Sequence, residues 1–566
     1  METKTCQNCK SKFTIEQEDF NFYEKIKVPP PTFCPECRLI RRLACANERV
    51  LYKRKCDLSG KDIFSMYPEN TKFPVYETKL WYGDGWDPYQ YGVDYDFSKS
   101  FFEQFLELSN KVPKMALVKQ GFSVDSEYTH RVHDMKNSYM VFRTSQSIDS
   151  LYVYTADDII NCVDCFNIAQ CELCYECLDC IKCFKTIFCQ DCTECRDSSF
   201  LYDCRNCSNC IGCMNLRSQD YCIFNKKYTK EEYFKKLKEL KLNTFSGIKK
   251  MEKEFSEFRK KQPQRFAVFL KSENFSGNWF TNCKNVNQSF ECRNIKDGKY
   301  LFSIFNVEDC MDYYQWGNSS ELIYESANVG INSSRICFST QCWMSASDLW
   351  YCDSCPSSRY CFGCIGLKKG EYAILNKKYT KEEYENLLPK IIEQMKKISY
   401  KDGRGKEYKF GEFFPESFSS FAYNETAAAD FSPLTKEEVI LKGYKWKERE
   451  KKNYTTTIDS TSLPETIGEV EDSILDEIIS CGEKDSQYSV GAYRITQNEL
   501  SFYRRMDLPL PRVCFDVRHM RRLTKRPKIK LEKRNCTKCS LEVETVYSES
   551  FAPVIYCEKC YQQEVY

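Results

Sequence analysis

This chain of 566 residues has a small net charge, three histidines and no long apolar run, and each of these features excludes some classes of function. Lys and Arg number 83 against 81 Asp and Glu, so the formal net charge of +2 gives no overall field for nucleic acid or an anionic membrane. No run of about 18 apolar residues occurs, which excludes a membrane-spanning helix. The first residues also lack the apolar stretch of a secretory signal. We therefore expect a cytoplasmic protein that does not bind membranes.

Catalytic signatures are also missing. The chain has three histidines, and the pair His130 and His133 lacks the accompanying Glu of a metalloprotease motif. We find neither a Gly-rich phosphate loop nor a nucleophile elbow. The sequence therefore predicts neither an enzyme nor a small-molecule substrate.

Cysteine, by contrast, is abundant, with 36 residues. A reducing cytoplasm keeps thiols out of disulfides, which leaves metal binding or packing as their role. Disulfides would become the leading interpretation only if the chain were exported by a route without a recognisable signal.

Eight cysteines form two separate sets of four, one near each end of the chain. Each set contains two Cys-x-x-Cys pairs, a pattern that can place four thiolates tetrahedrally around zinc. Four thiolates leave no open coordination position, so we predict about two zinc ions with a structural and not a catalytic role. The predicted ligands are Cys6, Cys9, Cys34 and Cys37 in one set, and Cys536, Cys539, Cys557 and Cys560 in the other.

A duplication relates the two ends. FYEKIKVPPPTFCPECRLIRRL at 22–43 recurs as FYRRMDLPLPRVCFDVRHMRRL at 502–523, an offset of 480 residues. We interpret both ends as copies of an ancestral module with two zinc sites, of which the first copy kept site one and the second kept site two. Cys56 and Cys514 are then remnants of lost sites, whereas Cys45 and Cys481 have no partner in this comparison. The same offset aligns Ser486, Ser489 and Val517 with Cys6, Cys9 and Cys37, and Ser59, Glu77 and Leu80 with Cys539, Cys557 and Cys560.

Each copy also carries three arginines spaced i, i+3 and i+4, which places them on one face of a helix. They persist in the copy that lost the zinc ligands beside them, so they serve something other than that metal. One interpretation is contact with the phosphates of RNA or DNA. The other is salt bridging within the module or a solvated helix face. The six residues are Arg38, Arg41, Arg42, Arg518, Arg521 and Arg522.

A second duplication lies inside the chain. YCIFNKKYTKEEY at 221–233 recurs as YAILNKKYTKEEY at 372–384, an offset of 151 residues. Each copy contains a Thr-Lys-Glu-Glu capping box, and a third such box begins at Thr435. The pattern predicts helices at 229–241, 248–262 and 380–397. The polar and acidic stretch from about 450 to 485 is typical of a linker.

Between Cys162 and Cys222 all 15 cysteines lie on one three-residue frame, with Asp, Asn or Glu often just before the frame position. An α-helix is excluded because 3.6 residues per turn would spread these cysteines over every face. A further spacing of 21 residues, as between Cys162 and Cys183, favours a parallel β-solenoid of about 21 residues per turn with Asp and Asn at its corners. A plain strand alternates every two residues, so the corners must absorb the difference. In the second copy the frame holds Cys283, Cys292, Cys310, Cys337, Cys352, Cys355, Cys361 and Cys364, and only Cys342 lies off it.

Three roles are open for these middle cysteines: packing of the coil interior, metal binding and disulfides. The shift of 151 residues replaces cysteines by Thr340, Trp343, Ala346 and Ser358. A metal ligand does not become Trp or Ala in a conserved fold, whereas a core position can. The comparison therefore favours packing.

The pieces CPECRLIRRL, CIGCMNLRSQDYCIFNKKYTKEEY and VIYCEKCYQQEVY resemble a group of uncharacterised cysteine-rich zinc-ribbon proteins from genome-reduced candidate bacterial phyla. The similarity runs over most of the chain, and the NKKYTKEEY-type segment is its most specific part. The resemblance implies zinc binding. Such proteins sometimes carry a CaiB/BaiF label, but that CoA-transferase family is α/β, and nothing in this sequence alternates strands and helices around a nucleotide pocket.

Together these patterns predict a mostly β fold with helical insertions, in which two parallel β-solenoid blocks are flanked by terminal zinc-ribbon or treble-clef modules. The predicted function is a non-enzymatic zinc-binding scaffold for an unknown protein or nucleic-acid partner. Nucleic-acid binding through the Arg-rich helices and a polymer-acting enzyme on a solenoid groove are the alternatives. The predicted segments are a zinc-ribbon module 1–60, an aromatic-rich connector 61–124, block one 125–228, a helical insertion 229–275, block two 276–379, a helix 380–400, a connector and linker 401–485, and a zinc-ribbon module 486–566.

Overall fold

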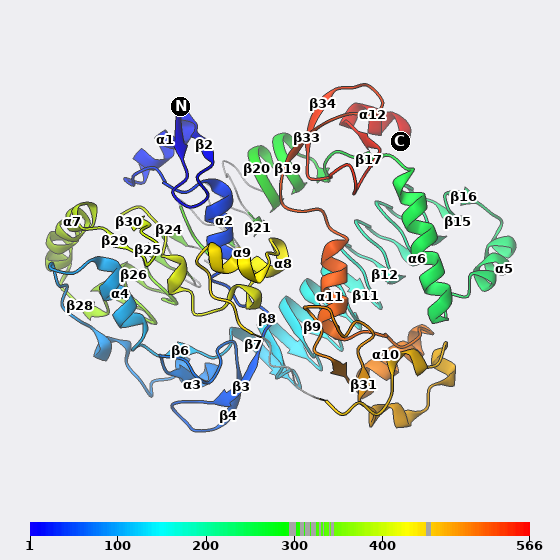
Figure 1. Ribbon diagram of the computed structural model, residues 1–566, viewed down its shortest axis with the longest axis horizontal. Helices are drawn as coiled ribbons and strands as arrows, with labels where there is room; N and C mark the ends of the chain where they lie inside the picture. The colour runs from blue at the N-terminus through cyan, green and yellow to red at the C-terminus, as the bar shows by residue number, and fades with distance from the viewer. Residues whose placement is uncertain are drawn as a thin grey trace.

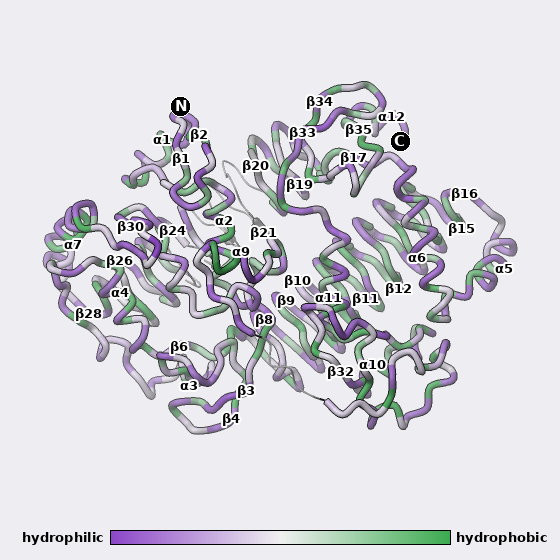
Figure 2. The backbone as a smooth tube through the Cα atoms, in the orientation of Figure 1, coloured by the Kyte–Doolittle hydropathy of each residue, from purple (hydrophilic) through white to green (hydrophobic). Residues whose placement is uncertain are grey.

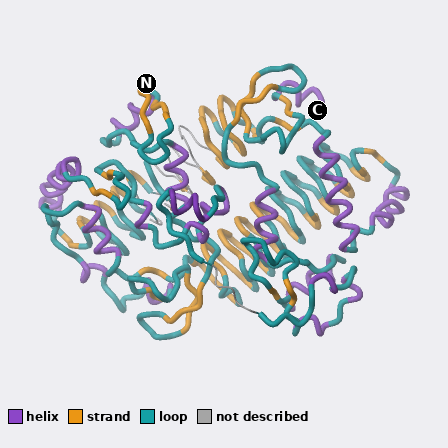
Figure 3. The backbone as a smooth tube through the Cα atoms, viewed as in Figure 1, coloured by secondary structure: helices purple, strands orange, loops and turns teal. Residues whose placement is uncertain are grey.

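The computed structural model describes residues 1–293, 302–305, 311, 317–318, 324–327, 330–331, 333–338, 340, 345–448 and 454–565. Helices and strands are mixed throughout, and the largest sheet has ten strands (Figures 1 and 3). No helix in these ranges is both long and apolar enough to cross a bilayer.

The ten-stranded sheet, which we call the first ladder, follows the chain order from β7 to β16. Its neighbouring strands are parallel up to β15, and the short β16 returns antiparallel. The strands are β7 Lys119–Val124, β8 Thr129–Lys136, β9 Val141–Ile148, β10 Tyr154–Ile160, β11 Phe166–Glu172, β12 Phe184–Ile187, β13 Arg196–Ser199, β14 Ser208–Ile211, β15 Asp220–Ile223 and β16 Lys226–Lys227.

Paired residues in the first ladder lie twelve positions apart. Tyr154 pairs with Phe166, and bridges continue the row to Leu178. The predicted repeat of 21 residues is therefore wrong. Twelve and 21 are both multiples of three, so cysteines 21 residues apart share the triplet frame without stacking on one another.

The backbone explains the triplet frame. Every third residue from Arg131 to Phe224 has a positive φ, between 45° and 65°. This left-handed conformation costs most L-residues about 1–2 kcal/mol, and Asn and Asp tolerate it best. The residue before each frame position occupies it, which accounts for the Asp and Asn found there. A turn at every third residue, and not a strand that alternates in twos, sets the frame.

Frame residues form the interior of the first ladder. The cluster of buried cysteines also contains Val153, Ile159, Ile168 and Leu201, all on the same frame. This confirms that the middle cysteines fill an apolar core alongside ordinary hydrophobic residues. Figure 2 shows the resulting recurrence of apolar residues along the ladder.

A second ladder holds the repeated segment in two sheets. One contains β18 Phe269–Leu270, β19 Glu273–Thr281, β20 Lys284–Arg293 and β21 Phe302–Phe305, and the other contains β24 Ser334–Cys337, β25 Ser347–Trp350, β26 Arg359–Phe362, β27 Glu371–Ile374 and β28 Lys377–Lys378. Pairing between β24 and β25 is shifted to thirteen residues, with Ile336 opposite Leu349. Ile336 thus takes the inward position, and Cys337 packs beside Phe338 in an outer cluster. Placing Cys337 on the inward frame was wrong because of this one-residue insertion; Cys310 and Cys342 lie outside the described residues.

The capping boxes mark helices as predicted. Thr229, Thr380 and Thr435 each accept a backbone N–H three residues on and begin helices α5, α7 and α9. The helix predicted at 248–262 begins earlier, after Thr244. The helices are α1 Gln17–Lys25, α2 Pro35–Leu43, α3 Thr78–Tyr82, α4 Phe101–Ser109, α5 Lys230–Leu240, α6 Phe245–Lys260, α7 Lys381–Lys397, α8 Ala427–Phe431, α9 Lys436–Leu441, α10 Gln497–Met506, α11 Phe515–Thr524 and α12 Glu558–Val565.

The predicted linker is ordered where the structure describes it. Residues 454–485 contain three short 3-10 turns and a strand, β31 Ile479–Ser480. Leu463, Ile467 and Ile474 are buried in one cluster with Leu500 of α10. The linker prediction is wrong here because these spaced apolar residues pack against the first ladder despite the acidic composition around them.

The left-handed positions can be tested at Asn161, whose φ is 50°. We expect Asn161→Val to lower the free energy of unfolding by about 1–2 kcal/mol, because a β-branched side chain is strained at positive φ. Asn161→Gly removes the side chain without that strain and should stay within about 0.5 kcal/mol of wild type. Urea unfolding midpoints with unchanged m-values measure both. Equal loss in the two variants would contradict a backbone origin.

Candidate metal centres and arginine junctions

Site one is assembled from a hairpin and a helix start. Strands β1 Glu2–Thr5 and β2 Lys12–Ile15 enclose the turn that carries Cys6 and Cys9. Cys34 is the N-cap of α2, and Cys37 lies in its first turn. The four sulfur atoms lie within 4.8 Å of one another and could hold a metal ion.

Site two repeats this arrangement. Strands β33 Glu532–Asn535 and β34 Glu542–Thr545 flank Cys536 and Cys539, while Cys557 immediately precedes α12 and Cys560 lies within it. These four sulfurs also lie within 4.8 Å of one another. The structure thus brings together both predicted ligand sets.

The sulfur spacing fits a metal better than a disulfide. Cys9 and Cys34 Sγ lie 3.6 Å apart, as do Cys539 and Cys557 Sγ. Tetrahedral zinc with Zn–S bonds of about 2.3 Å requires S–S separations of about 3.8 Å, whereas a disulfide bond is about 2.05 Å long. In each site the second cysteine, Cys9 or Cys539, is exposed, and the other three are buried.

Backbone amides prepare these thiols for deprotonation. The Cys34 N–H donates to Cys6 Sγ at 3.3 Å. In site two, burial opposes ionisation, but backbone N–H groups of Cys557 and Cys539 lower the pKa of Cys536 to about 6. A metal binds the thiolate form, so a lowered thiol pKa favours loading.

The cysteines that we interpret as remnants of lost sites keep the same local geometry. Cys514 N–H donates to Cys481 Sγ at 3.3 Å, which matches the bond from Cys34 to Cys6. Cys481 is therefore the counterpart of Cys6, and its assignment as unpartnered and the alignment of Ser486 with Cys6 were wrong because the hairpin lengths differ. At the other remnant, Glu77 N–H donates to Cys56 Sγ at 3.3 Å.

Five of the six predicted phosphate-binding arginines are buried. Arg38, Arg41, Arg42, Arg518 and Arg522 are each at most 5% exposed. Only the side chain of Arg521 is accessible, at 43%, and it pairs with Glu483. Phosphate contact through the other five is contradicted because their guanidinium groups face protein carboxylates and carbonyls.

The C-terminal arginines dock α11 onto the first ladder. Arg518 Nε lies 2.8 Å from Asp164, and Arg522 Nη1 lies 2.8 Å from both Asp164 and Glu176. Arg526 pairs with Asp179 at 2.9 Å. All three acids occupy left-handed positions: Glu176 lies twelve residues after Asp164 in the same row, and Asp179 lies three residues further on, in the next row. The residue before the frame position was the signal in the sequence that could have identified them.

The N-terminal arginines make the equivalent contacts on the second ladder. Arg41 Nη2 lies 2.6 Å from Glu325, and Arg42 Nη1 lies 3.5 Å from the same carboxylate. The neighbouring aromatic pairs also correspond. Tyr23 meets Tyr324 edge-on at 5.2 Å, and Tyr503 meets Tyr175 edge-on at 5.8 Å. The two modules therefore repeat one docking interface, each on a different ladder.

A second buried charge group joins the ladder to the centre of the molecule. Glu48 lies 3.7 Å from Arg131 and 3.5 Å from Arg143, and Tyr154 donates to the same carboxylate. Arg49 forms a two-pronged contact with Asp430 at 3.0 and 3.1 Å. No local sequence pattern predicts these contacts, because the acids and arginines are single residues far apart in the chain.

The middle cysteines act as thiol donors. Cys162 Sγ lies 3.4 Å from the carbonyl oxygens of Ile160 and Cys171. Ser138 Oγ makes the same two contacts, with the carbonyls of Lys136 and Ser147 at 3.0 and 3.3 Å. No further group of three or more Cys, His, Asp or Glu in the described ranges comes close enough to hold a metal. The described cysteines are all free of disulfides.

The two clustered histidines do not converge. His130 is fully buried and accepts the Val118 N–H at Nδ1, and burial lowers its pKa well below the usual value. His133 Nδ1 lies 2.9 Å from the Asp134 carboxylate at the surface. Neither belongs to a metal-holding group among the residues described.

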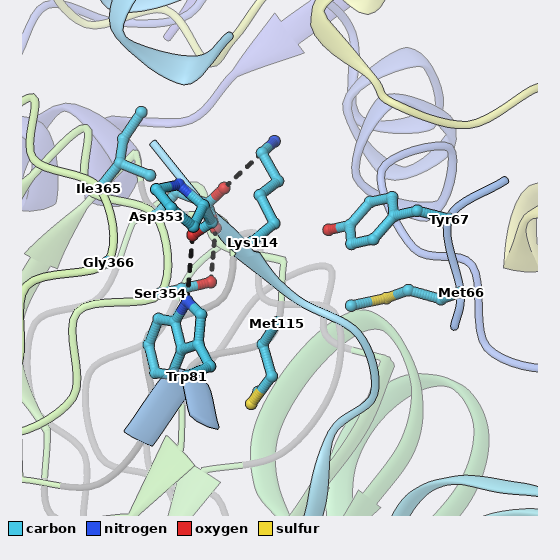
Figure 4. A pocket seen from close by; sticks show the side chains of 10 residues that line it. Met66, Tyr67, Trp81, Lys114, Met115, Asp353, Ser354, Ile365 and Gly366 are labelled. Carbon is cyan, nitrogen blue, oxygen red and sulfur yellow. Dashed lines mark hydrogen bonds and ion pairs between the residues drawn. The ribbon is translucent and has the colours of Figure 1, made fainter. Parts of the chain in front are cut away.

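A small cavity lies where the connector meets the second ladder (Figure 4). Its volume is about 10 Å³, enough for about one water molecule. Lys114 Nζ lies 4.0 Å from Asp353, and Trp81 Nε1 donates to the Pro113 carbonyl at 3.0 Å. Burial lowers the pKa of Lys114, and the Asp353 carboxylate opposes this shift. The cavity is too small for a substrate.

Comparison with protein-family models, curated proteins and solved structures produced no match for the chain.

The arginine junction can be tested at Arg522, with Arg521 as its matched control. Arg522→Ala leaves Asp164 and Glu176 buried without this cation, and we expect a loss of about 3–5 kcal/mol in the free energy of unfolding at pH 7.5. Arg521→Ala, at an exposed position, should change it by about 0.5 kcal/mol or less.

The same variant should depend on pH. Burial raises the pKa of Glu176, and Arg522 opposes that shift. In Arg522→Ala the folded pKa rises further above the unfolded value, so stability increases as the pH falls and carboxylates take up protons. Urea unfolding at pH 5 should therefore show a smaller loss than at pH 7.5. An equal loss at both pH values would argue against buried carboxylates as its cause.

Proposed function

We propose that this protein is a cytoplasmic, non-enzymatic scaffold in which two structural zinc ions fix terminal modules onto a pair of parallel β-solenoid blocks. The 3.6 Å sulfur separations in both four-cysteine sets carry this proposal, because they match a zinc cage and not a disulfide. Each hairpin-plus-helix arrangement is of the zinc-ribbon or treble-clef kind. The proposal agrees with the resemblance to cysteine-rich zinc-ribbon proteins.

The solenoid part rests on the twelve-residue register. Residues return to the same row every twelve positions, and the frame residues share one buried cluster. A coil with four corners, one at every third residue, satisfies both observations. In the first block, rows such as Ile148 and Ile160 stay partly exposed, which leaves outer faces available to a protein partner.

Nucleic-acid binding through the six arginines is not the proposed function. It would need accessible guanidinium groups, and only Arg521 among the six predicted arginines has one. The balanced net charge of +2 gives no compensating attraction.

Metal content tests the proposal directly. We expect elemental analysis of the purified chain to find about two zinc ions per molecule. Cys37→Ser and Cys560→Ser should each reduce this to about one, because each removes one of four thiolates. Cys56→Ser, a substitution in a remnant site, is the matched control and should keep both ions. A zinc content near zero in the wild-type chain, with folded termini, would contradict the proposed zinc-stabilised scaffold.

A further inference from the structure

Both four-cysteine sites lie against the second ladder. Site one shares its apolar cluster with Tyr324, Phe338 and Tyr351 of that ladder. Arg41, one turn beyond Cys37, pairs with Glu325. The cage of site one thus positions the helix that grips this ladder.

Site two holds the beginning of the second ladder. Strand β35 Ile555–Tyr556 pairs in parallel with β17 Gln264–Arg265. Arg265 contacts the Glu558 carboxylate through two nitrogens at 2.6 and 2.7 Å. Thr545 Oγ1 donates to the Phe266 carbonyl at 2.6 Å. In Figure 1, β33, β34 and α12 accordingly lie beside β19 and β20.

Both remnant modules contact the first ladder, and each also reaches the second, through Lys114 with Asp353 and through Arg526 with Glu291. The remnant at Cys514 begins α11, which is held by the arginines that reach Asp164 and Glu176. The remnant at Cys56 shares a cluster with Phe142 and Tyr154. Its strand β5 Val75–Tyr76 pairs with β6 Lys114–Met115, just before the first ladder. These two modules, which lack a four-thiolate set, therefore supply contacts to the first ladder, and site two adds the hydrogen bonds of Tyr561 in α12 with Asp203 and Asn215.

We infer that the two metal ions act together as a clasp on the second ladder, while β8–β12 of the first ladder are held by buried ion pairs and apolar packing. The inference rests on the proposed zinc binding. Each ion stabilises a small element with little core of its own, and that element supplies the contacts to the second ladder. Loss of one ion leaves the other module attached to the same body, so the second contact remains intramolecular and reforms readily. Loss of both ions removes both sets of contacts with the second ladder.

Release would uncover a specific surface. The face under site one carries Tyr324, which meets Tyr23 edge-on, and Glu325, which pairs with Arg41; both are fully buried.

Hydrogen exchange of the full chain, measured by mass spectrometry with and without EDTA, tests the clasp. With both ions removed, we expect amides of β19, β26 and β27 to exchange at least about tenfold faster, because local opening exposes them. Amides of β10–β12 should change less than about twofold. Peptides around 203–217 are excluded from the comparison, because Tyr561 of α12 donates to Asp203 there.

Single-site variants separate the contributions of the two metal sites. Cys37→Ser and Cys560→Ser should each give a smaller acceleration in the second ladder than EDTA does, and the double variant should equal EDTA. Cys56→Ser should match wild type. Removal of both ions, verified by elemental analysis, without faster exchange in the second ladder would overturn the clasp and leave zinc binding standing. Equal acceleration in both ladders would overturn it as well. A wild-type chain without bound zinc would instead overturn the proposed function on which the clasp rests.

Discussion

A backbone that turns left-handed at every third residue is the constraint on which this structure depends. Paired residues in the first ladder lie twelve positions apart, and the frame residues between the left-handed positions share one buried cluster. The same turns leave carbonyl oxygens close to the interior. Cysteine satisfies both demands, since its thiol is compact, apolar and a weak donor to those carbonyls. Ser138 and Ser358 make the same contacts through their hydroxyl groups, whereas Val153 and Leu201 fill frame positions without a donor.

The constraint also determines how the terminal modules attach. Left-handed positions favour Asp and Asn, and the twelve-residue register places these side chains in rows along the ladder. Asp164 and Glu176 are neighbours in one such row. Buried carboxylates need cations, and the arginines of α11 supply them. The buried cysteines and the carboxylates that receive the arginines therefore both follow from one backbone repeat.

Much of the local structure could be predicted from the sequence, because it depends on neighbours in the chain. The Cys-x-x-Cys pairs and the capping boxes at Thr229 and Thr380 are signals of this kind. The triplet frame indicated the interior correctly. The repeat length could not be predicted from the frame, since repeats of 12 and of 21 residues both fit it and only the pairing register distinguishes them. The role of the arginines was open for a similar reason: Glu325 lies 284 residues from Arg41, and no local pattern joins them.

The two ends of the chain show two solutions to one docking problem. Around Cys514 the cage has been replaced by an apolar cluster with Cys481 and Val517, while the arginine contacts persist. The first ladder offers α11 two carboxylates at adjacent turns, so each guanidinium group has a close partner. On the second ladder, Arg41 and Arg42 share Glu325, and the contact from Arg42 is longer, at 3.5 Å. Both helices thus make buried arginine–carboxylate contacts, although of the two only α2 begins at a four-cysteine set. The docking contacts of α11 therefore do not require such a set.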